Sequence, residues 1–366
     1  MSLGICQNTQ REEGLVSSKT KASLPNFMKR YGNLFDKITT LANLQEAYRR
    51  SARGKHWQRA VKEYDKDPLP WLLKLKESLK QGTYHTAPYK TKRIHEPKER
   101  TIYILPFYPD RIVHHAVMNV LEPIFNKLMI KDSYACRKGK GQHAGSTRCM
   151  EMVRRNKYCL KCDISKFYPS VNHVVLKRII RHKIKDKELL ALLDEIIDST
   201  HTETNVPIGN YLSQWFGNLY MNEVDKYVKQ TLHFKDYIRY CDDFCFFSND
   251  KDELRKIRAW LPEYLDKQLK LRLSKCQLFP TSQGVDFLGY RHFPRYILVR
   301  KRTAKRIKRH LRETMHLLRQ GRITPETAKS KIASAKGWIQ HANAHNYTMA
   351  NHINELWEEV KAYEQV

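Results

Sequence analysis

Apolar residues recur at helical spacing over most of this 366-residue chain. The first such segment, 35–53, is followed by a break at Pro68 and Pro70, a new helix over 71–79 and a stop at Gly82. Further helices are predicted at 110–129, 143–156, 172–182, 186–198, 210–232 and 251–268. Strands are predicted at 158–163, 237–247, 271–279 and 284–292. Helices packed on one side of a small antiparallel sheet make an α+β fold.

Two further segments have a distinct pattern. Residues 86–107 alternate basic and apolar positions, and Glu-Pro-Lys-Glu at 96–99 predicts the turn of a two-stranded hairpin. After Pro294 the chain becomes basic and helical, with Arg and Lys dense over 300–319. A second helix is predicted to start at Thr-Pro-Glu, 324–326, since proline is favoured at early helical positions. The basic helix is either a solvated face or a surface for a polyanion.

An acidic pair interrupts the most apolar of these strands. Residues 237–248 read Tyr-Ile-Arg-Tyr-Cys-Asp-Asp-Phe-Cys-Phe-Phe-Ser, so Asp242 and Asp243 lie between two aromatic runs. Asp is almost never fully buried without a partner. A lone Asp-Asp is usually a solvated turn. Here the two aromatic runs predict a pair of strands with the acids at the turn between them. Such a hairpin places both carboxylates at a sheet edge that a divalent metal can reach. We therefore expect a metal site here.

A second carboxylate follows another strand. Residues 158–171 read Tyr-Cys-Leu-Lys-Cys-Asp-Ile-Ser-Lys-Phe-Tyr-Pro-Ser-Val, and Asp163 ends the apolar stretch. Asp163 alone could be a helix N-cap. Together with the acidic pair it suits two-metal phosphoryl transfer, in which two ions clamp the attacking and leaving oxygens. Because Mg²⁺ keeps several waters and takes only one or two carboxylates, three aspartates are enough.

The composition indicates which kind of partner the chain binds. Lys and Arg number 67 against 38 acidic residues, which gives a formal net charge of +29. Such an excess indicates a polyanionic partner, although a solvated basic surface would explain part of it. No apolar run of 18 residues and no signal-peptide pattern occurs, so we expect no membrane span. Cys159 and Cys162 would lie on opposite faces of their strand, and we interpret the scattered cysteines as reduced thiols.

These motifs resemble those of reverse transcriptases. Tyr-Cys-Asp-Asp at 240–243 is similar to the family's Tyr-x-Asp-Asp box, and residues 163–168 resemble its first palm motif. The other similar blocks, in the family's order, are 100–106 with 110–113, 135–143, 273–275 and 284–290. The likeness runs from about residue 33 to 345. It implies a right-hand polymerase with fingers, a palm bearing the small antiparallel sheet, and a helical thumb.

One block resembles a particular subfamily. Most reverse transcriptases have Gln-Gly-x-x-x-Ser-Pro where residues 208–214 read Ile-Gly-Asn-Tyr-Leu-Ser-Gln. This form is typical of reverse transcriptases from diversity-generating retroelements. These enzymes copy a template-repeat RNA into cDNA with errors at adenines, and the cDNA replaces a variable repeat in a target gene (mutagenic retrohoming). We expect the same of this chain.

The resemblance also implies domains and catalytic roles. It assigns 1–30 to a polar lead, 31–157 to fingers with part of the palm, 158–292 to the palm and 293–366 to the thumb. Two Mg²⁺ ions, with Mn²⁺ as a substitute, would lie at a metal site formed by Asp163, Ile164, Asp242 and Asp243. Lys275 would act as a general acid toward pyrophosphate, although a lysine in a basic loop is usually only solvated.

Substrate-contacting residues follow in the same way. Arg100, and less directly Lys98, would contact the dNTP triphosphate, unless this basic hairpin merely grips the template backbone. Tyr168 would be the steric gate against ribose, unless it is a packed core ring. The remaining expected dNTP contacts are Phe167, Ile208 and Gly209. The expected primer grip is Phe287, Leu288, Gly289 and Tyr290, with Gly289 allowing close approach of the primer.

Ile208 suggests a physical basis for low fidelity. A polar side chain that contacts a base pair loses hydrogen bonds when the geometry is wrong, and that loss discriminates strongly. Isoleucine offers only shape and apolar contact, so we hypothesise that Ile208 loosens nucleotide selection. The alternative is that Ile208 is simply a core residue at the start of the 210–232 helix.

Two rival functions remain at this stage. One is a retron or group II intron-like reverse transcriptase of ordinary fidelity, and the other is a non-catalytic RNA-binding scaffold with a polymerase fold. The three retained aspartates weigh against the scaffold. The resemblance implies template RNA, primer or cDNA, dNTPs and a small basic ring-forming accessory protein as partners. It also implies a cytoplasmic location in a bacterial or phage-encoded system.

Overall fold

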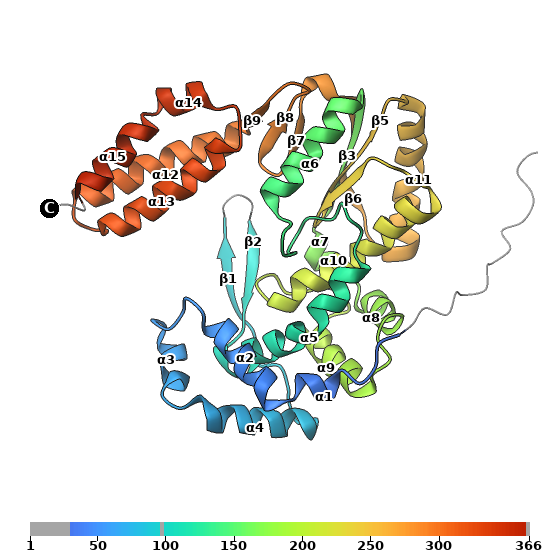
Figure 1. Ribbon diagram of the computed structural model, residues 1–366. Helices are drawn as coiled ribbons and strands as arrows, with labels where there is room; N and C mark the ends of the chain where they lie inside the picture. The colour runs from blue at the N-terminus through green and yellow to red at the C-terminus, as the bar shows by residue number, and fades with distance from the viewer. Residues whose placement is uncertain (1–29, 96–98, 364–366) are drawn as a thin grey trace, which may run out of the picture.

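The computed structural model of this chain describes residues 30–95 and 99–363. Its N-terminal part is helical and carries one hairpin that rises toward the C-terminal helices (Figure 1). The elements are α1 (Phe35–Ile38), α2 (Leu41–Ala52), α3 (Arg59–Asp65), α4 (Pro68–Lys80), β1 (Lys90–Ile94), β2 (Arg100–Ile104), a π-helical turn (Phe107–Arg111) and α5 (Ile112–Leu128). The predicted hairpin over 86–107 is confirmed. The predicted polar lead lies outside the described residues, apart from residue 30.

Two N-terminal helix predictions were wrong in detail. The single helix expected over 35–53 is divided at Thr40, whose side chain accepts a hydrogen bond from the backbone of Asn43 and caps α2. The prolines at 68 and 70 do not precede a helix; they lie in the first turn of α4. Proline is tolerated there because the first helical N–H groups have no intrahelical acceptor in any case.

A four-stranded antiparallel sheet forms the centre of the molecule. Its strands are β3 (Tyr158–Ile164), β4 (Tyr237–Tyr240), β5 (Asp243–Ser248) and β6 (Leu273–Pro280), in the order β4-β5-β3-β6. Alternate residues face opposite sides. Leu160 and Phe246 belong to the main core with α10 (Tyr211–Lys226), whereas Cys159 and Phe247 pack in a second cluster with α6 (Gln142–Arg155). The expectation that helices cover one side only was therefore wrong.

The last predicted palm strand belongs to a different sheet. Residues 284–292 form a hairpin of β7 (Val285–Phe287) and β8 (Tyr290–His292), which pairs with β9 (Ile297–Val299) in a separate three-stranded sheet. Leu288 and Gly289 make its turn with φ of 55° and 83°. Two central residues with positive φ are typical of the tight turns that join twisted antiparallel strands. Periodicity finds such strands but not their pairing partners.

The predicted helices around the central sheet are confirmed to within a few residues. They are α6, α8 (His173–Arg181), α9 (Lys187–Asp198), α10 with a π-helical extension (Tyr227–Thr231), and α11 (Lys251–Leu269). Two short elements were not predicted: α7 (Phe167–Ser170) and a 3-10 turn (Thr281–Gln283) after β6. Within residues 30–95 and 99–363, no helix combines the length and apolar character that a membrane span requires.

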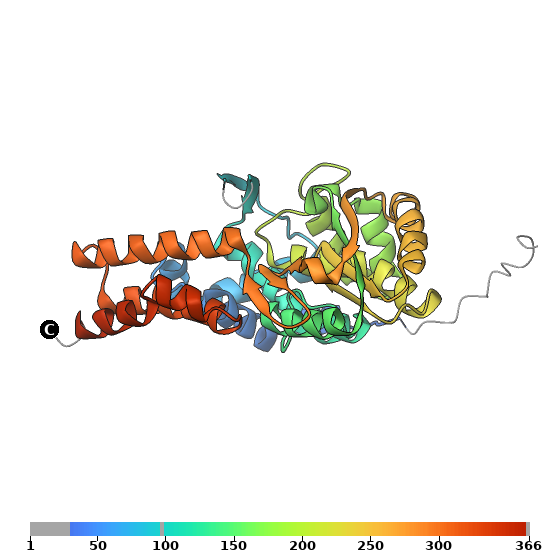
Figure 2. The same ribbon diagram turned by 90° about the horizontal axis from the view of Figure 1, so that it is seen from above.

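The C-terminal helices form their own core and extend to one side of the sheet (Figure 2). They are α12 (Lys301–Arg319), α13 (Pro325–Gln340), α14 (His345–Ala350) and α15 (Ile353–Tyr363). On α12, Ile307, Leu311, Met315 and Leu318 are buried against α13 and α15, and the Lys and Arg positions lie mainly on the exposed remainder. Thr324 caps α13 through a hydrogen bond from Thr327, which confirms the predicted start.

Candidate active site

Strand register brings the expected catalytic residues together at one end of the central sheet. Asp163 on β3 lies opposite Asp243 on β5 and opposite Lys275 on β6. Asp242 occupies the β4–β5 turn beside them, where Cys241 has a left-handed φ of 57°. Burial raises the pKa of Asp242 above its ordinary value, and the neighbouring carboxylate of Asp163 raises it further. Negative charge is therefore concentrated at this edge.

Asp243 is held differently from the other two carboxylates. Its Oδ2 is 3.2 Å from Nζ of Lys161, and the two side chains are 26% and 16% exposed. Burial raises the pKa of Asp243 to about 6, although Lys161 lowers it. The Lys161 ammonium also donates to the backbone carbonyl of Asp286 on β7. Lys161 therefore ties Asp243 to the second sheet.

The donor set suits a hard cation that keeps water and substrate ligands. Oδ1 of Asp243 is buried with no hydrogen-bond partner, and Oδ2 of Asp163 accepts only from Ser274 Oγ at 2.7 Å among the described residues. That part of the chain contains no group of three or more His, Cys, Asp or Glu residues arranged to hold a metal by themselves. Mg²⁺ does not need such a group, because it binds through one or two carboxylates plus phosphates.

The β1–β2 hairpin reaches this edge and docks on the start of α10. Arg100, at the start of β2, lies close enough to Asp242 to lower the pKa of that carboxyl in opposition to burial. The Tyr103 backbone N–H donates to the carbonyl of Ile208 at 2.8 Å. A Cβ on Gly209 would lie 2.7 Å from the Tyr103 carbonyl oxygen, so this position requires glycine. Lys98 lies outside the described residues.

Phe167 and Tyr168 lie on α7, directly after the Asp163 strand. Phe167 is buried, while Tyr168 is half-buried and its hydroxyl lies 3.3 Å from Sγ of Cys241 in the β4–β5 turn. Both rings contact Gly217 of α10, where a Cβ would come within 3.0 Å of Phe167 and 3.2 Å of Tyr168. The rings are thus packed between β3 and α10.

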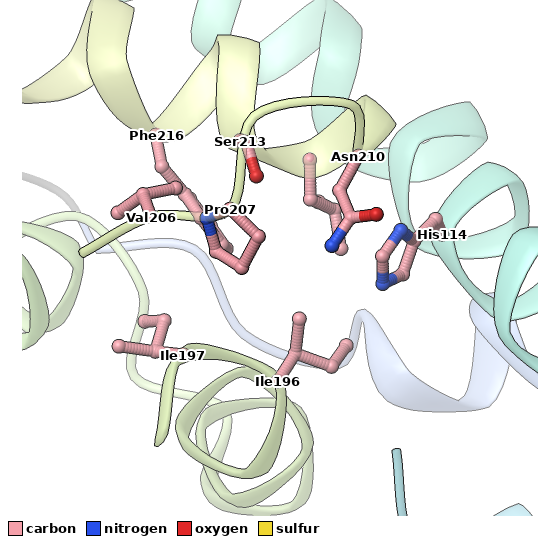
Figure 3. A pocket seen from close by; sticks show the side chains of 9 residues that line it. His114, Ile196, Ile197, Val206, Pro207, Asn210, Ser213 and Phe216 are labelled. Atoms are coloured by element: carbon pink, nitrogen blue, oxygen red, sulfur yellow. The ribbon is translucent and has the colours of Figure 1, made fainter. Parts of the chain in front are cut away.

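Ile208 is half-buried and lies just before α10, so it is not part of the main core. A small cavity of about 10 Å³ lies beside this segment, lined by residues that include His114, Asn210 and Ser213 (Figure 3). This volume suits one water molecule and excludes a nucleotide.

His114, which lines this cavity, should make the stability of the fold depend on pH. Burial lowers the pKa of His114 to about 3, well below the 6.5 of an unfolded histidine. Below pH 6.5 the unfolded chain therefore takes up a proton that the folded chain does not. As the pH falls from 6 to 4, we expect His114 to reduce the free energy of unfolding by about 1.4 kcal/mol for each pH unit.

Urea unfolding at stepped pH measures this effect. His114→Gln should lose the corresponding slope, whereas the exposed His310→Gln on α12 should retain it. Equal slopes in the wild type and His114→Gln would contradict the assignment.

The expected primer-grip residues form the β7–β8 turn. Phe287 and Tyr290 are buried, and the Leu288 carbonyl accepts a hydrogen bond from Gln142 Nε2 at 2.6 Å. At Gly289 the close neighbour is Trp338 of α13, since a Cβ there would lie 2.7 Å from its ring. Glycine is thus required at this position both by its φ of 83° and by the close approach of the C-terminal helices.

Sequence reasoning missed several residues that support the site. Lys161 and Arg239 alternate with apolar residues in their strands, a pattern that does not distinguish an internal ion pair from an exposed charge. Ser274 lies inside the recognised block 273–275 but had no assigned role. The expectation that Cys159 and Cys162 face opposite sides is confirmed, because they belong to different hydrophobic clusters.

Comparison with known proteins agrees with this geometry. A family model described as "Reverse transcriptase (RNA-dependent DNA polymerase)" matches residues 90–292, more than half of the chain. The chain belongs to the reverse transcriptase family. It is an RNA-directed DNA polymerase with a right-hand polymerase fold.

Several curated relatives of this reverse transcriptase are bacterial. Protein YkfC of Escherichia coli K12 is 27% identical over 280 residues, covering 63% of this chain and 71% of YkfC. The group II intron-encoded protein LtrA of Lactococcus lactis subsp. cremoris is 23% identical, and the match covers 72% of this chain but only 57% of LtrA. The retron Ec73 reverse transcriptase of E. coli is 25% identical, covering 72% of this chain and 84% of that protein.

Among solved structures, apo telomerase from Candida tropicalis is similar with a TM-score of 0.46 and 13% identity. The match covers 75% of this chain and 63% of the telomerase chain.

Proposed function

We propose that this reverse transcriptase copies a template-repeat RNA into adenine-mutagenised cDNA for diversity-generating retrohoming. The observation that carries the proposal is Ile208. It occupies the position of the family's glutamine, is half-buried, and joins the nucleotide-side hairpin to α10 through its carbonyl. A side chain without hydrogen-bonding groups discriminates weakly between nucleotides. A retron or group II intron-like enzyme of ordinary fidelity is the second candidate, supported by the similarity to LtrA and the Ec73 enzyme.

The proposed reaction is attack of a primer 3′-hydroxyl on the α-phosphate of a dNTP, with release of pyrophosphate. Asp163 and Asp242 would hold two Mg²⁺ ions, with Asp243 in a supporting role because Lys161 already neutralises it. Bound metal would activate the 3′-hydroxyl and neutralise the phosphates. Ile164 would contribute to this site only through its main chain, since its side chain is buried and apolar. Exposed Lys275, opposite Asp163, would protonate the pyrophosphate.

The incoming nucleotide would lie between the hairpin and the catalytic turn. Arg100, and Lys98 beyond the described residues, would contact its triphosphate. Tyr168 would lie under the sugar as the steric gate, with Phe167 packed behind it. Ile208 and Gly209 would face the new base pair. The proximity of Arg100 to Asp242 and of Tyr168 to Cys241 supports this arrangement.

The primer–template duplex would be held by the β7–β8 turn and the C-terminal helices. We assign residues 31–157 to fingers with part of the palm, 158–292 to the palm and 293–366 to the thumb. The 287–290 turn would grip the primer, and the basic face of α12 would contact phosphates. Partners would be template RNA, primer or cDNA and a small basic ring-forming accessory protein, in the cytoplasm of a bacterial or phage-infected cell.

The test is the error spectrum of the purified enzyme. cDNA would be made on a retroelement-type template RNA, with Mg²⁺ or Mn²⁺ and with or without accessory protein, and then sequenced. We expect adenine-centred errors from the wild type and several-fold fewer from Ile208→Gln, because glutamine restores hydrogen-bonding discrimination. Ile208→Leu is the matched control, since it stays apolar and should retain the errors.

The other outcomes separate the alternatives. Uniformly faithful wild-type products would support the ordinary-fidelity enzyme and reject the mutagenic one. Absence of product with any primer or metal would favour the non-catalytic scaffold. Equal error rates in Ile208→Gln and the wild type would remove Ile208 as the determinant.

A further inference from the structure

Arg239 is a fully buried cation directly behind the catalytic turn. It lies on β4 three residues before Asp242, and neither its side chain nor that of its partner Asp225 has measurable exposure. Nε donates to Asp225 Oδ1 at 2.8 Å and Nη2 donates to Oδ2 at 2.6 Å. The Tyr237 hydroxyl donates to the same Asp225 carboxylate at 2.8 Å. Asp225 on α10 is thus fully engaged in holding the guanidinium in one orientation.

The other donors of Arg239 point away from Asp225. Nη1 donates to the backbone carbonyl of Cys241 at 2.9 Å and to Oδ1 of Asn218 at 3.2 Å. Nη2 donates to Oγ of Ser133 at 3.1 Å. The guanidinium therefore joins three segments: helix α10, the 132–134 segment that runs beside β4, and the turn that carries the catalytic aspartates.

The hydrogen bond to the Cys241 carbonyl ends on a residue of the turn with a strained backbone conformation. Cys241 is not glycine, yet it has a left-handed φ of 57°. Side chains disfavour this conformation, and it persists only where the surroundings impose it. A charge-assisted hydrogen bond to its carbonyl opposes relaxation of the turn. Relaxation would rotate the next peptide and move Asp242 relative to Asp163.

We propose that Arg239 is a positioning residue of this polymerase, which fixes the Cys241–Asp242 turn against α10 so that Asp242 stays beside Asp163. The inference rests on the polymerase activity of the family and not on the mutagenic subfamily. A buried ion pair adds little net stability over apolar residues of the same shape. The directed set of donors, one of which ends on the catalytic turn, therefore indicates a geometric role. Lysine cannot replace it, because an ammonium lacks the planar fork.

The experiment compares three variants in primer extension. Arg239→Lys keeps the charge but loses the fork, and the double variant Arg239→Met with Asp225→Leu replaces the pair by apolar side chains. Arg181→Lys is the matched control, since its pair with Asp194 joins α8 to α9 away from the turn. Each protein is first checked for cooperative thermal unfolding. The readouts are kcat, KM for dNTP and the Mg²⁺ concentration at half-maximal rate.

We expect both Arg239 variants to lose on the order of 10- to 100-fold in kcat, the usual effect of removing a residue that orients metal-binding groups. The half-saturating Mg²⁺ concentration should rise severalfold, while KM for dNTP changes less than twofold. A purely structural role would lower the unfolding temperature without moving the Mg²⁺ dependence.

The proposal would be overturned if Arg239→Lys or the apolar double variant folds and keeps a kcat and a Mg²⁺ dependence within twofold of the wild type. Should neither fold, Asp225→Asn provides the decision, because it keeps the shape while weakening the hold on Arg239. An unchanged Mg²⁺ dependence in a folded Asp225→Asn would likewise reject the positioning role. Complete loss of activity in the Arg181→Lys control would show that the effect is not specific to the turn.

Discussion

Asp163→Asn and Asp242→Asn are each expected to lower the rate of DNA synthesis by at least about 100-fold, the scale at which single electrostatic groups act in active sites. Asparagine keeps the size of the side chain but removes the negative charge that a divalent cation needs. Both residues lie at the strand ends where β3 and the β4–β5 turn meet. The measurement is single-nucleotide primer extension at saturating dNTP and Mg²⁺.

The control for these variants is Asp252→Asn, an exposed aspartate in the first turn of α11. It should extend primers at the wild-type rate. Binding of primer-template should persist in all three proteins, because phosphate contacts by Lys and Arg supply most of that affinity. Substantial synthesis by Asp242→Asn would contradict the two-metal assignment.

Lys161→Met should lower the stability of the fold and shift the pH dependence of DNA synthesis. Removing the ammonium leaves Asp243 largely buried without its partner, which we expect to cost about 2 kcal/mol of unfolding free energy in the metal-free protein. This free-energy cost is smaller than that of breaking a fully buried pair, because both side chains keep some solvent contact.

The same substitution should shift the pH dependence of activity. Asp243 has a pKa of about 6 with Lys161 in place, and losing the cation raises that pKa. Since the carboxylate must be ionised to act, the acid limb of the rate profile should move to higher pH. Lys177→Met, which breaks the more exposed pair with Asp198, should leave the profile unchanged. An unmoved acid limb in Lys161→Met would reject the role of Lys161.

The local pattern was sufficient to find the three aspartates that we propose as catalytic, but not the residues that support them. Asp242 and Asp243 stand out because apolar strands flank them, and Asp163 because it ends a third such strand. Arg239 and Lys161 carry no comparable signal. Each is a charge inside an apolar strand, and only strand pairing and helix packing show that Asp225 and Asp243 are their partners.

Strand pairing explains one error in the predicted fold, and a helix cap explains another. The segment 284–292 was predicted correctly as β structure, yet it forms a separate sheet with β9. Strand propensity reflects how residues suit a pleated surface and does not specify the neighbour. Pro68 was misread for a similar reason: it is compatible with a helix start as well as a helix break, and the cap at Asp67 decides which.

By itself, the sequence determined the boundaries of the helices around the central sheet to within a few residues, the α+β class, the family and the positions of the three aspartates. These properties are local, because side-chain periodicity, caps and short motifs are set by residues close together in the chain. Only the tertiary structure decided that Asp163 faces Asp243, that Arg239 holds the Cys241 carbonyl, and that Trp338 occupies the space beside Gly289. Those contacts join residues distant in the sequence, and they depend on strand order and helix packing that no local pattern specifies.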